Sequence, residues 1–237
     1  MKKLALFVEG LTEQLFLEKL FIEIAGAKNI IIVSKMCYKT RNGKRVFKEI
    51  KATGASTKER EYYVLINDSG GESSVNSDIR DSCESLSKAG YEKILGLRDV
   101  APNWAYTDIP KLERSLRYGI PTKFIPFNIL LAVMEVEAWF VAETTHYGKI
   151  DPNITLSKII DLLSFNPKID DVEKRPMPSE DLDKIYNIAK KAYPKKKNRR
   201  QITRTINAID YNEIYFNLRS RIYRLNRLIS EIDDFLQ

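Results

Sequence analysis

The sequence has few of the side chains that bind soft metals or form disulfides. Its 237 residues include one histidine, His146, and two cysteines, Cys37 and Cys83. A Ser-His-Asp catalytic set is therefore possible only through His146, and a metal site built from several histidines is excluded. Two cysteines form neither a disulfide framework nor a zinc site, so we expect a reducing, cytoplasmic environment. Any metal must be held by carboxylates, which favours Mg²⁺, Mn²⁺ or Ca²⁺.

Long apolar runs are also absent. No stretch approaches the ~18 apolar residues that a transmembrane helix requires, and the run at residues 4–8 is too short for a signal peptide. The chain is 43% hydrophobic and 30% charged, which is typical of a globular protein with a substantial core. We therefore expect no membrane partner.

The net charge of +7 is unevenly distributed along the chain. Basic residues gather at residues 39–51 and, without a single acid among them, at residues 190–204. This asymmetry predicts a polyanionic partner, DNA or RNA, although a solvated surface is the alternative for any run of charges. The residues expected to contact phosphates are Lys195, Lys196, Lys197, Arg199, Arg200 and Arg204.

Strand and helix patterns alternate through the first part of the chain. An apolar run at residues 4–8, followed by helix-period hydrophobics at 14–25 with Thr12 as N-cap, predicts a buried strand leading into a helix. Further strands are expected at residues 29–36, 47–51, 62–67, 93–97 and 122–131. Further helices are expected at residues 78–88, 109–118 and 134–142. The alternation predicts an α/β fold with a mostly parallel, Rossmann-like sheet flanked by helices.

The character of the sequence changes after residue 150. The strands at 29–36 and 47–51 are expected to form a hairpin around Asn42-Gly43, but no strand is expected beyond residue 151. Helices are expected there at residues 156–163, 179–192, 200–209 and 214–235. The sequence thus predicts an α/β domain at residues 1–150 and a basic helical appendage at residues 151–237.

Acidic residues follow three of the expected strands. Glu9, Asp68 and Asp99 stand at strand ends, the edge at which open α/β sheets bind ligands. Glu135 and Glu137 come later, in otherwise apolar sequence. Converging carboxylates repel one another unless a cation neutralises them, and two divalent ions can clamp a phosphodiester during in-line hydrolysis. The pattern therefore predicts a divalent-metal site that acts on phosphodiesters.

Each acid also has a structural interpretation. Glu9 and Glu13 stand at a helix start, where the helix dipole favours acids, and Asp68 begins an Asp-Ser-Gly-Gly turn. Asp99 can form an ion pair with its neighbour Arg98, and the two later glutamates can pair with Lys or Arg. No single acid is specific for metal binding, so the hypothesis depends on their shared placement after strands.

Two segments resemble the motifs of Toprim domains. The segment Glu9-Gly10-x-Thr12-Glu13, between strand and helix, is similar to the first Toprim motif. The strand that ends Ile66-Asn67-Asp68-Ser69-Gly70-Gly71 resembles the second motif, an Asp-x-Asp. The resemblance covers residues 1–143 and implies a Toprim-like sheet.

Overcoming-lysogenization-defect (OLD) nucleases, a branch of the Toprim family, bind two metals through a Glu-x-x-x-Glu, an Asp-x-Asp and a later x-x-Glu element. Glu9/Glu13 and Glu135/Glu137 match the first and last of these elements. Gly70 stands where the second Asp is expected, and Asp99 has no simple counterpart. The combination also resembles small Toprim-like proteins encoded beside ABC-type ATPases in anti-phage systems.

The resemblance implies a nuclease, a hydrolase of DNA or RNA that depends on one or two Mg²⁺ or Mn²⁺ ions. The implied metal ligands, which are also catalytic residues, are Glu9, Asp68, Asp99, Glu135 and Glu137. Glu13, or a carboxylate that does not bind metal, is the candidate general base, and residues 195–197 offer a lysine for the developing phosphorane charge. An ABC-type ATPase subunit and a second copy of the chain are the implied protein partners, in anti-phage defence.

Two other classes of function compete with the nuclease. A catalytically weak Toprim-fold subunit that binds nucleic acid or protein is favoured by Gly70 in place of the second Asp. A phosphate-handling protein with Asp68 or Asp99 as phosphoacceptor is a third hypothesis. Against it, the chain has neither a Gly-Lys-Ser/Thr loop nor a Gly-x-Gly-x-x-Gly pattern, and the first motif is left without a role.

Overall fold

The computed structural model describes residues 1–54, 60–194 and 198–237, which form two compact units. Unit 1 comprises Met1–Arg98, Pro110–Leu131 and Ser230–Gln237, and unit 2 comprises Asp99–Ile109 and Ala132–Ile229. The units therefore interleave along the chain and do not divide at residue 150. Among the described helices, none is long and apolar enough to cross a membrane.

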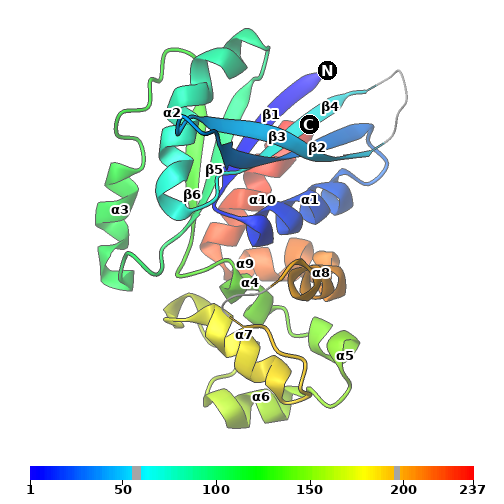
Figure 1. Ribbon diagram of the computed structural model, residues 1–237. Helices are drawn as coiled ribbons and strands as arrows, with labels where there is room; N and C mark the ends of the chain where they lie inside the picture. Colours follow the sequence, from blue (N-terminus) through cyan, green and yellow to red (C-terminus); the bar gives the residue numbers. More distant parts are fainter. Residues whose placement is uncertain (55–59, 195–197) are drawn as a thin grey trace. The chain divides into compact units, whose positions relative to one another are not determined.

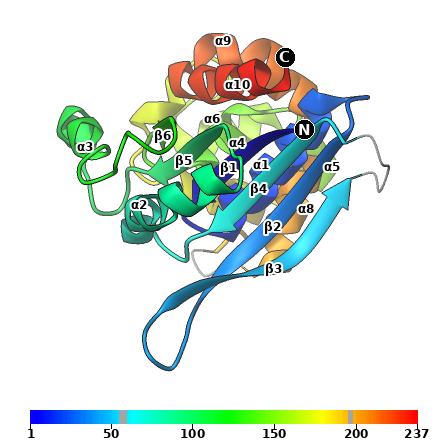
Figure 2. The ribbon, with the colours of Figure 1, turned by 90° about the horizontal axis from the view of Figure 1, so that it is seen from above.

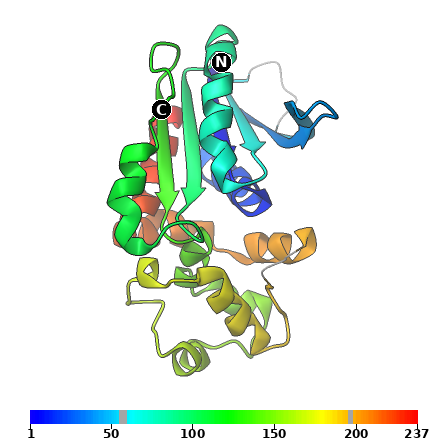
Figure 3. The same cartoon turned by 60° about the vertical axis from the view of Figure 1, so that its left-hand side comes forward.

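Unit 1 is built on a six-stranded sheet with the order β3-β2-β4-β1-β5-β6 (Figure 1). Its strands are β1 (Lys2–Val8), β2 (Ile30–Lys39), β3 (Arg45–Gly54), β4 (Tyr62–Asp68), β5 (Lys93–Asp99) and β6 (Phe127–Ala132). The pairs β1–β4, β1–β5 and β2–β4 are parallel, and β2–β3 is antiparallel. The arrows of β5 and β6 run in the same direction (Figure 3). This mixed α/β fold, with its mostly parallel sheet, is the class that the sequence predicts.

The sheet of unit 1 is covered on both faces by helices. Ser34 of β2 donates a hydrogen bond to Glu18 of α1 (Leu11–Ala25), whereas Gly96 of β5 faces Ile79 of α2 (Glu72–Lys88). The crossover from β1 runs one way across the sheet and the crossover from β4 runs the other, so right-handed connections place their helices on opposite faces. Helix α3 (Ile109–Ser115) follows β5.

The first helix begins earlier than the sequence suggests. It starts at Leu11, with Gly10 as N-cap and no side-chain cap, so the expected capping role of Thr12 is wrong. Thr12 instead lies inside the first turn and is buried. The helix buries Phe16, Leu17 and Leu20 against the sheet, which is where its apolar side chains are needed.

The hairpin expected around Asn42-Gly43 is present. Strands β2 and β3 pair in antiparallel register from Ile31↔Gly54 to Lys39↔Arg45. The turn is closed by the amide of Thr40, which donates to the carbonyl of Lys44 at 2.8 Å. In Figure 2 the hairpin extends past the ends of the neighbouring strands.

The last residues of the chain complete the core of unit 1. Tyr62 donates its hydroxyl to the carbonyl of Leu236 at 2.9 Å, and its ring meets Phe235 edge-on at 5.6 Å. Glu231 accepts hydrogen bonds from Lys93 and Asn128. Ser230–Gln237, in the region expected as a helical appendage, is thus grouped with unit 1.

Unit 2 is helical, and its described residues contain no strand apart from the final residues of β5 and β6, Asp99 and Ala132. Short 3₁₀ turns occur at Tyr106–Asp108 and Val172–Lys174. The helices are α4 (Glu137–Ala142), α5 (His146–Ile150), α6 (Leu156–Leu163), α7 (Pro178–Asn187), α8 (Arg199–Ala208), α9 (Arg219–Arg221) and α10 (Tyr223–Leu236), which continues into unit 1. Helix α6 has the bounds expected from the sequence.

The continuous helix expected at residues 214–235 is wrong. Glu213–Leu218 is π-helical, and Ile222 leaves the helical conformation with φ −115° and ψ 100°. The side chains of Ile214, Leu218 and Leu225 are buried on both sides of this break. A pattern of buried side chains therefore continues through the segment although the backbone does not.

Candidate functional site

Glu9 and Asp68 lie at the carboxyl ends of two adjacent parallel strands of unit 1. Val8 of β1 is in register with Asp68 of β4, and Glu9 follows directly. The amide of Ser69 donates to the carbonyl of Val8 at 2.8 Å, and the amide of Gly71 donates to the carbonyl of Glu9 at 2.7 Å. The two strand ends are thus joined by backbone hydrogen bonds at the sheet edge where open α/β folds bind ligands.

Asp68 is a buried carboxylate at the start of a tight turn. One of its oxygens accepts a hydrogen bond from the amide of Gly70 at 2.8 Å. Burial raises the pKa of the Asp68 carboxyl, and the Gly70 amide lowers it by a smaller amount. Gly70 and Gly71 have φ values of +66° and +141°, a conformation that a residue with a side chain rarely adopts. The turn interpretation of this segment is therefore correct, and it leaves the second Asp68 oxygen for a further ligand.

Glu9 faces an arginine from the neighbouring strand. Leu97 of β5 is in register with Val8 of β1, so Arg98 and Glu9 are the next residues along two neighbouring chains. Nε of Arg98 lies 4.0 Å from Oε1 of Glu9. The guanidinium also donates to the side chain of Asn76 on α2 at 3.0 Å. The contact between Glu9 and Arg98 is not evident from the sequence, since it depends on the strand order.

Glu13 lies in the first turn of α1 and is 6% exposed. A methyl group at Gly10 would lie 3.6 Å from Oε2 of Glu13, so this carboxylate folds back over the N-cap. The position is electrostatically favourable for an acid because the amide dipoles of the helix point toward it. Glu13 thus belongs to the same strand-to-helix turn as Glu9, as the spacing predicts.

Two polar side chains that received no role in the sequence-based prediction, Gln14 and Ser69, are buried beside this turn. Gln14 donates its amide to the carbonyls of Ile66 and Lys35 at 3.1 and 2.8 Å. Its oxygen, and the hydroxyl of Ser69, have no hydrogen-bond partner among the described residues. Gln14 follows Glu13 in the sequence, and Ser69 follows Asp68. Their position next to these motif residues is the only sequence feature that could have pointed to them.

Arg45 has a structural role, because its guanidinium group is hydrogen-bonded within the protein. Its guanidinium spans from β3 to Asp78 of α2, with hydrogen bonds of 2.8 and 2.7 Å, and also donates to the carbonyl of Ser69. The hydrogen bonds to Asp78 raise the pKa of Arg45. Arg45 thus holds the Asp68 turn in place, which removes it from the basic cluster expected to contact polyanions.

The other predicted acids belong to unit 2. Asp99 accepts a hydrogen bond from the amide of Val136 at 3.0 Å, between the two predicted glutamates. Next to them, Met134 has a φ of +57°, and its carbonyl accepts from the amides of Val100 and Ala101. Asp99, Glu135 and Glu137 are therefore held close together by the junction of these two segments.

Both glutamates of this group accept hydrogen bonds from protein hydroxyls. Glu135 accepts from the amide and the hydroxyl of Ser179 at 2.7 and 2.9 Å, which caps the N-terminus of α7. Glu137 is 2% exposed and accepts from the hydroxyl of Tyr193 at 3.0 Å. These contacts give each glutamate a structural role within unit 2.

The predicted metal ligands are thus divided between the two units, with Glu9 and Asp68 in unit 1 and the rest in unit 2. Among the residues that the structure describes, no three His, Cys, Asp or Glu side chains are arranged to hold a metal ion. A metal site shared by all the predicted acids stays a prediction.

Of the predicted nucleic-acid contacts, Lys195, Lys196 and Lys197 lie outside the described residues. Arg199 and Arg200 are exposed in the first turn of α8. Arg204 is half-buried; it donates to the carbonyl of Ala192 at 2.8 Å and lies over the ring of Tyr186.

The single histidine forms a buried polar network in unit 2. His146 and Glu143 are fully buried, with Nδ1 of the ring 3.1 Å from Oε2 of Glu143. Nε2 lies 3.0 Å from the hydroxyl of Tyr186, which donates to Thr205. Burial alone would raise the pKa of Glu143. The hydrogen bond and the charge of His146 lower it, as do the hydrogen bonds from Thr145 and from the amide of Asp210, so the pKa of Glu143 lies below its usual value. His146 is placed as a structural group.

No protein-family model matches this chain, and the comparisons with curated proteins and with solved structures likewise give no match.

Proposed function

We propose that this protein is a nuclease that depends on Mg²⁺ or Mn²⁺ and hydrolyses phosphodiesters of DNA or RNA at the carboxylate edge of unit 1. The observation that carries the proposal is the adjacency of Glu9 and Asp68 at the carboxyl ends of two parallel strands. Hard divalent ions take carboxylate oxygens as ligands, and strand ends of this kind are the usual ligand site of α/β sheets.

Burial of Asp68 supports the assignment. A buried carboxylate is costly unless hydrogen bonds or a cation compensate it, and Asp68 receives one backbone hydrogen bond from Gly70. A divalent ion bound at Asp68 would compensate the remaining cost of burying its charge. The ion would polarise the scissile phosphate and the attacking water, and Glu13, on the same turn as Glu9, is the proposed acceptor of the proton of that water.

A nucleic-acid-binding subunit without hydrolysis is the second candidate, and specific contacts favour it. Arg98 already provides Glu9 with a cationic neighbour, and Gly70 stands where the Toprim motif has its second Asp. Such a subunit would use the basic residues of α8 and would have no need for a metal.

A nuclease assay separates the two candidates. Supercoiled DNA, single-stranded DNA and RNA are incubated with the full chain and Mg²⁺ or Mn²⁺, with Glu9→Gln and Asp68→Asn as test variants. Glu61→Gln, exposed before the opposite end of β4, is the matched control. We expect metal-dependent cleavage by the wild type and by Glu61→Gln only. Binding of a substrate without cleavage supports the second candidate, and neither binding nor cleavage contradicts both.

A further inference from the structure

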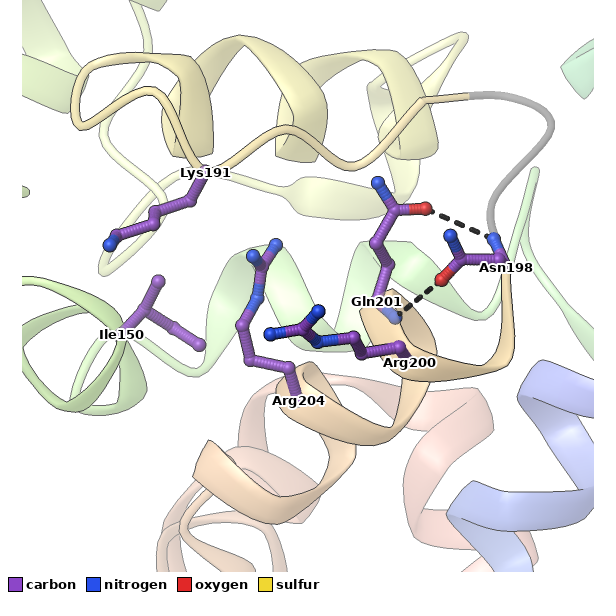
Figure 4. Close-up of a pocket in the computed structure, with 6 residues that line it drawn as sticks. All are labelled: Ile150, Lys191, Asn198, Arg200, Gln201 and Arg204. Atoms are coloured by element: carbon purple, nitrogen blue, oxygen red, sulfur yellow. Dashed lines mark hydrogen bonds between the residues drawn. The ribbon is translucent and has the colours of Figure 1, made fainter.

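A pocket of about 560 Å³ lies in unit 2, and none of the acids discussed above is among its described lining residues (Figure 4). It is lined by Ile150, Lys191, Asn198, Arg200, Gln201 and Arg204. Pockets that hold small molecules have volumes of roughly 300–1,000 Å³. Of the described residues that line it, three are cations and none is an acid or an aromatic residue.

The polar groups of this pocket are hydrogen-bond donors. The oxygen of the Asn198 side chain accepts from the amide of Gln201 at 3.1 Å, and the oxygen of the Gln201 side chain accepts from the amide of Asn198 at 3.0 Å. This capping box occupies the acceptor atoms of both side chains, as Figure 4 shows. Their NH₂ groups, the two guanidinium groups and the ammonium group of Lys191 remain, and all of these donate.

The arrangement is electrostatically unfavourable without a ligand. Arg200 and Arg204 are four residues apart on α8, a spacing at which like charges repel each other. The first turn of α8 contains no acid, although helix N-termini favour negative charge. An anion in the pocket would reduce the repulsion between the two arginines and would supply negative charge at the N-terminus of α8.

The existing contacts leave this charge only partly compensated. Lys191 lies 3.8 Å from the carboxylate of Asp151. Arg204 donates one hydrogen bond to the carbonyl of Ala192, but its Nε is buried without a partner among the described residues. A buried donor without an acceptor is costly, so these contacts do not satisfy all the donors of the Arg204 guanidinium group.

We propose that this pocket binds a phosphate monoester, either that of a free nucleotide or the terminal phosphate of a nucleic-acid strand. A monoester carries close to two negative charges near neutral pH and offers several acceptor oxygens, which matches a pocket of clustered donors. With no aromatic side chain in the described lining, bases have no stacking surface, so the phosphate and not the base determines affinity. The proposal does not depend on catalysis by unit 1.

Fluorescence anisotropy with a short, 3′-labelled, single-stranded oligonucleotide tests whether the pocket binds a phosphate monoester. The oligonucleotide is used with and without a 5′ phosphate, on the full chain and in the presence of EDTA. The test variants are Lys191→Gln and Arg200→Gln, and Arg199→Gln is the matched control, since it loses the same charge from the same helix turn but does not line the pocket.

We expect the wild type to bind the oligonucleotide with a 5′ phosphate at least about tenfold more tightly than the same oligonucleotide without it. Lys191→Gln and Arg200→Gln should remove most of this preference, whereas Arg199→Gln should keep it and weaken both complexes equally. Glu9→Gln should also keep it, so failure of the nuclease proposal leaves this result unaffected. Competition by AMP and inorganic phosphate indicates a free-nucleotide source, and competition by phosphorylated strands alone indicates a strand end. A wild type without preference, or an equal loss of preference in Arg199→Gln, overturns the proposal.

Discussion

Arg98 and Glu9 face each other from neighbouring parallel strands, with Nε of the arginine 4.0 Å from Oε1 of the glutamate. Neither side chain is more than 13% exposed, and Asn76 accepts a further hydrogen bond from the arginine. The pair gives Glu9 a positive neighbour within the protein itself. A metal ion bound at Glu9 therefore competes with Arg98 for the same carboxylate.

Replacing Arg98 by glutamine tests this competition. Because Glu9 would lose its cationic neighbour, we expect the free energy of unfolding without metal to fall by about 1–3 kcal/mol. Loss of the positive charge should also strengthen Mn²⁺ binding severalfold. Urea denaturation with EDTA and Mn²⁺ titration measure the two effects. Arg80→Gln, on the exposed face of α2, should change neither. An Mn²⁺ affinity equal to that of the wild type in Arg98→Gln contradicts the expected competition.

Replacing Asp68 by asparagine should not destabilise the protein near neutral pH. Burial raises the pKa of Asp68 above its ordinary 3.8, so the ionised form is less favourable in the folded than in the unfolded chain. The stability that this group contributes is present below pH 3.8 and is lost as the pH rises through the raised pKa.

The amide introduced by Asp68→Asn stays neutral at every pH, and its oxygen can still accept the hydrogen bond from Gly70. Urea denaturation with EDTA should therefore show Asp68→Asn as stable as the wild type or up to about 1 kcal/mol more stable at about pH 7, with a smaller difference at about pH 4. The exposed variant Asp81→Asn is the control. A large loss of stability in Asp68→Asn at neutral pH would indicate a structural role instead.

The Glu143 carboxylate should make the stability of the protein sensitive to acid. Its pKa in the folded chain lies below the ordinary value of 4.5, so its contribution is fully present above pH 4.5 and is lost as the pH falls through the lowered pKa. We expect Glu143→Gln to lower the free energy of unfolding by about 1–3 kcal/mol near neutral pH. The gap to the wild type should narrow in urea titrations below pH 4.5, and a gap that is constant with pH would disprove the linkage.

The end of α10 should be essential for unit 1. Ending the chain at Ile229 removes Phe235 and Leu236 from the edge of Tyr62, and we expect a loss of more than about 3 kcal/mol in the free energy of unfolding. Deletion of Gln237 alone, which is exposed, should have no effect. Calorimetry measures the stability of both truncated chains. If the chain ending at Ile229 is as stable as the wild type, the last residues of α10 do not contribute to the stability of unit 1.

The sequence was sufficient to predict the α/β class, the hairpin and the placement of Glu9 and Asp68 at strand ends, because apolar residues that recur with a period of 2 or 3.6 indicate the buried faces of strands and helices. It was not sufficient to predict the partner of Glu9. Arg98 reaches Glu9 only because β5 lies beside β1, and the strand order is a property of the whole fold. The break at Ile222 was missed for a related reason, since buried side chains continue through it while the backbone changes.

Glu135 and Glu137 show the same difficulty at the candidate site. Their sequence context predicts buried carboxylates, and the structure bears this out for Glu137. The donors that satisfy them, Ser179 and Tyr193, come from segments over forty residues away in sequence. A local pattern can indicate that a buried acid needs a partner, but it cannot say whether that partner is a metal or a distant hydroxyl.

Whether Glu9 and Asp68 hold a metal ion is measured by titrating the folded chain with Mn²⁺ and following the electron paramagnetic resonance signal of the free ion. We expect saturable binding by the wild type and by Glu61→Gln, with affinity at least about tenfold lower in Asp68→Asn and in Glu9→Gln, because each removes a carboxylate ligand from the ion. Equal binding by all four proteins, or no binding by the wild type, would contradict a metal site at the ends of β1 and β4.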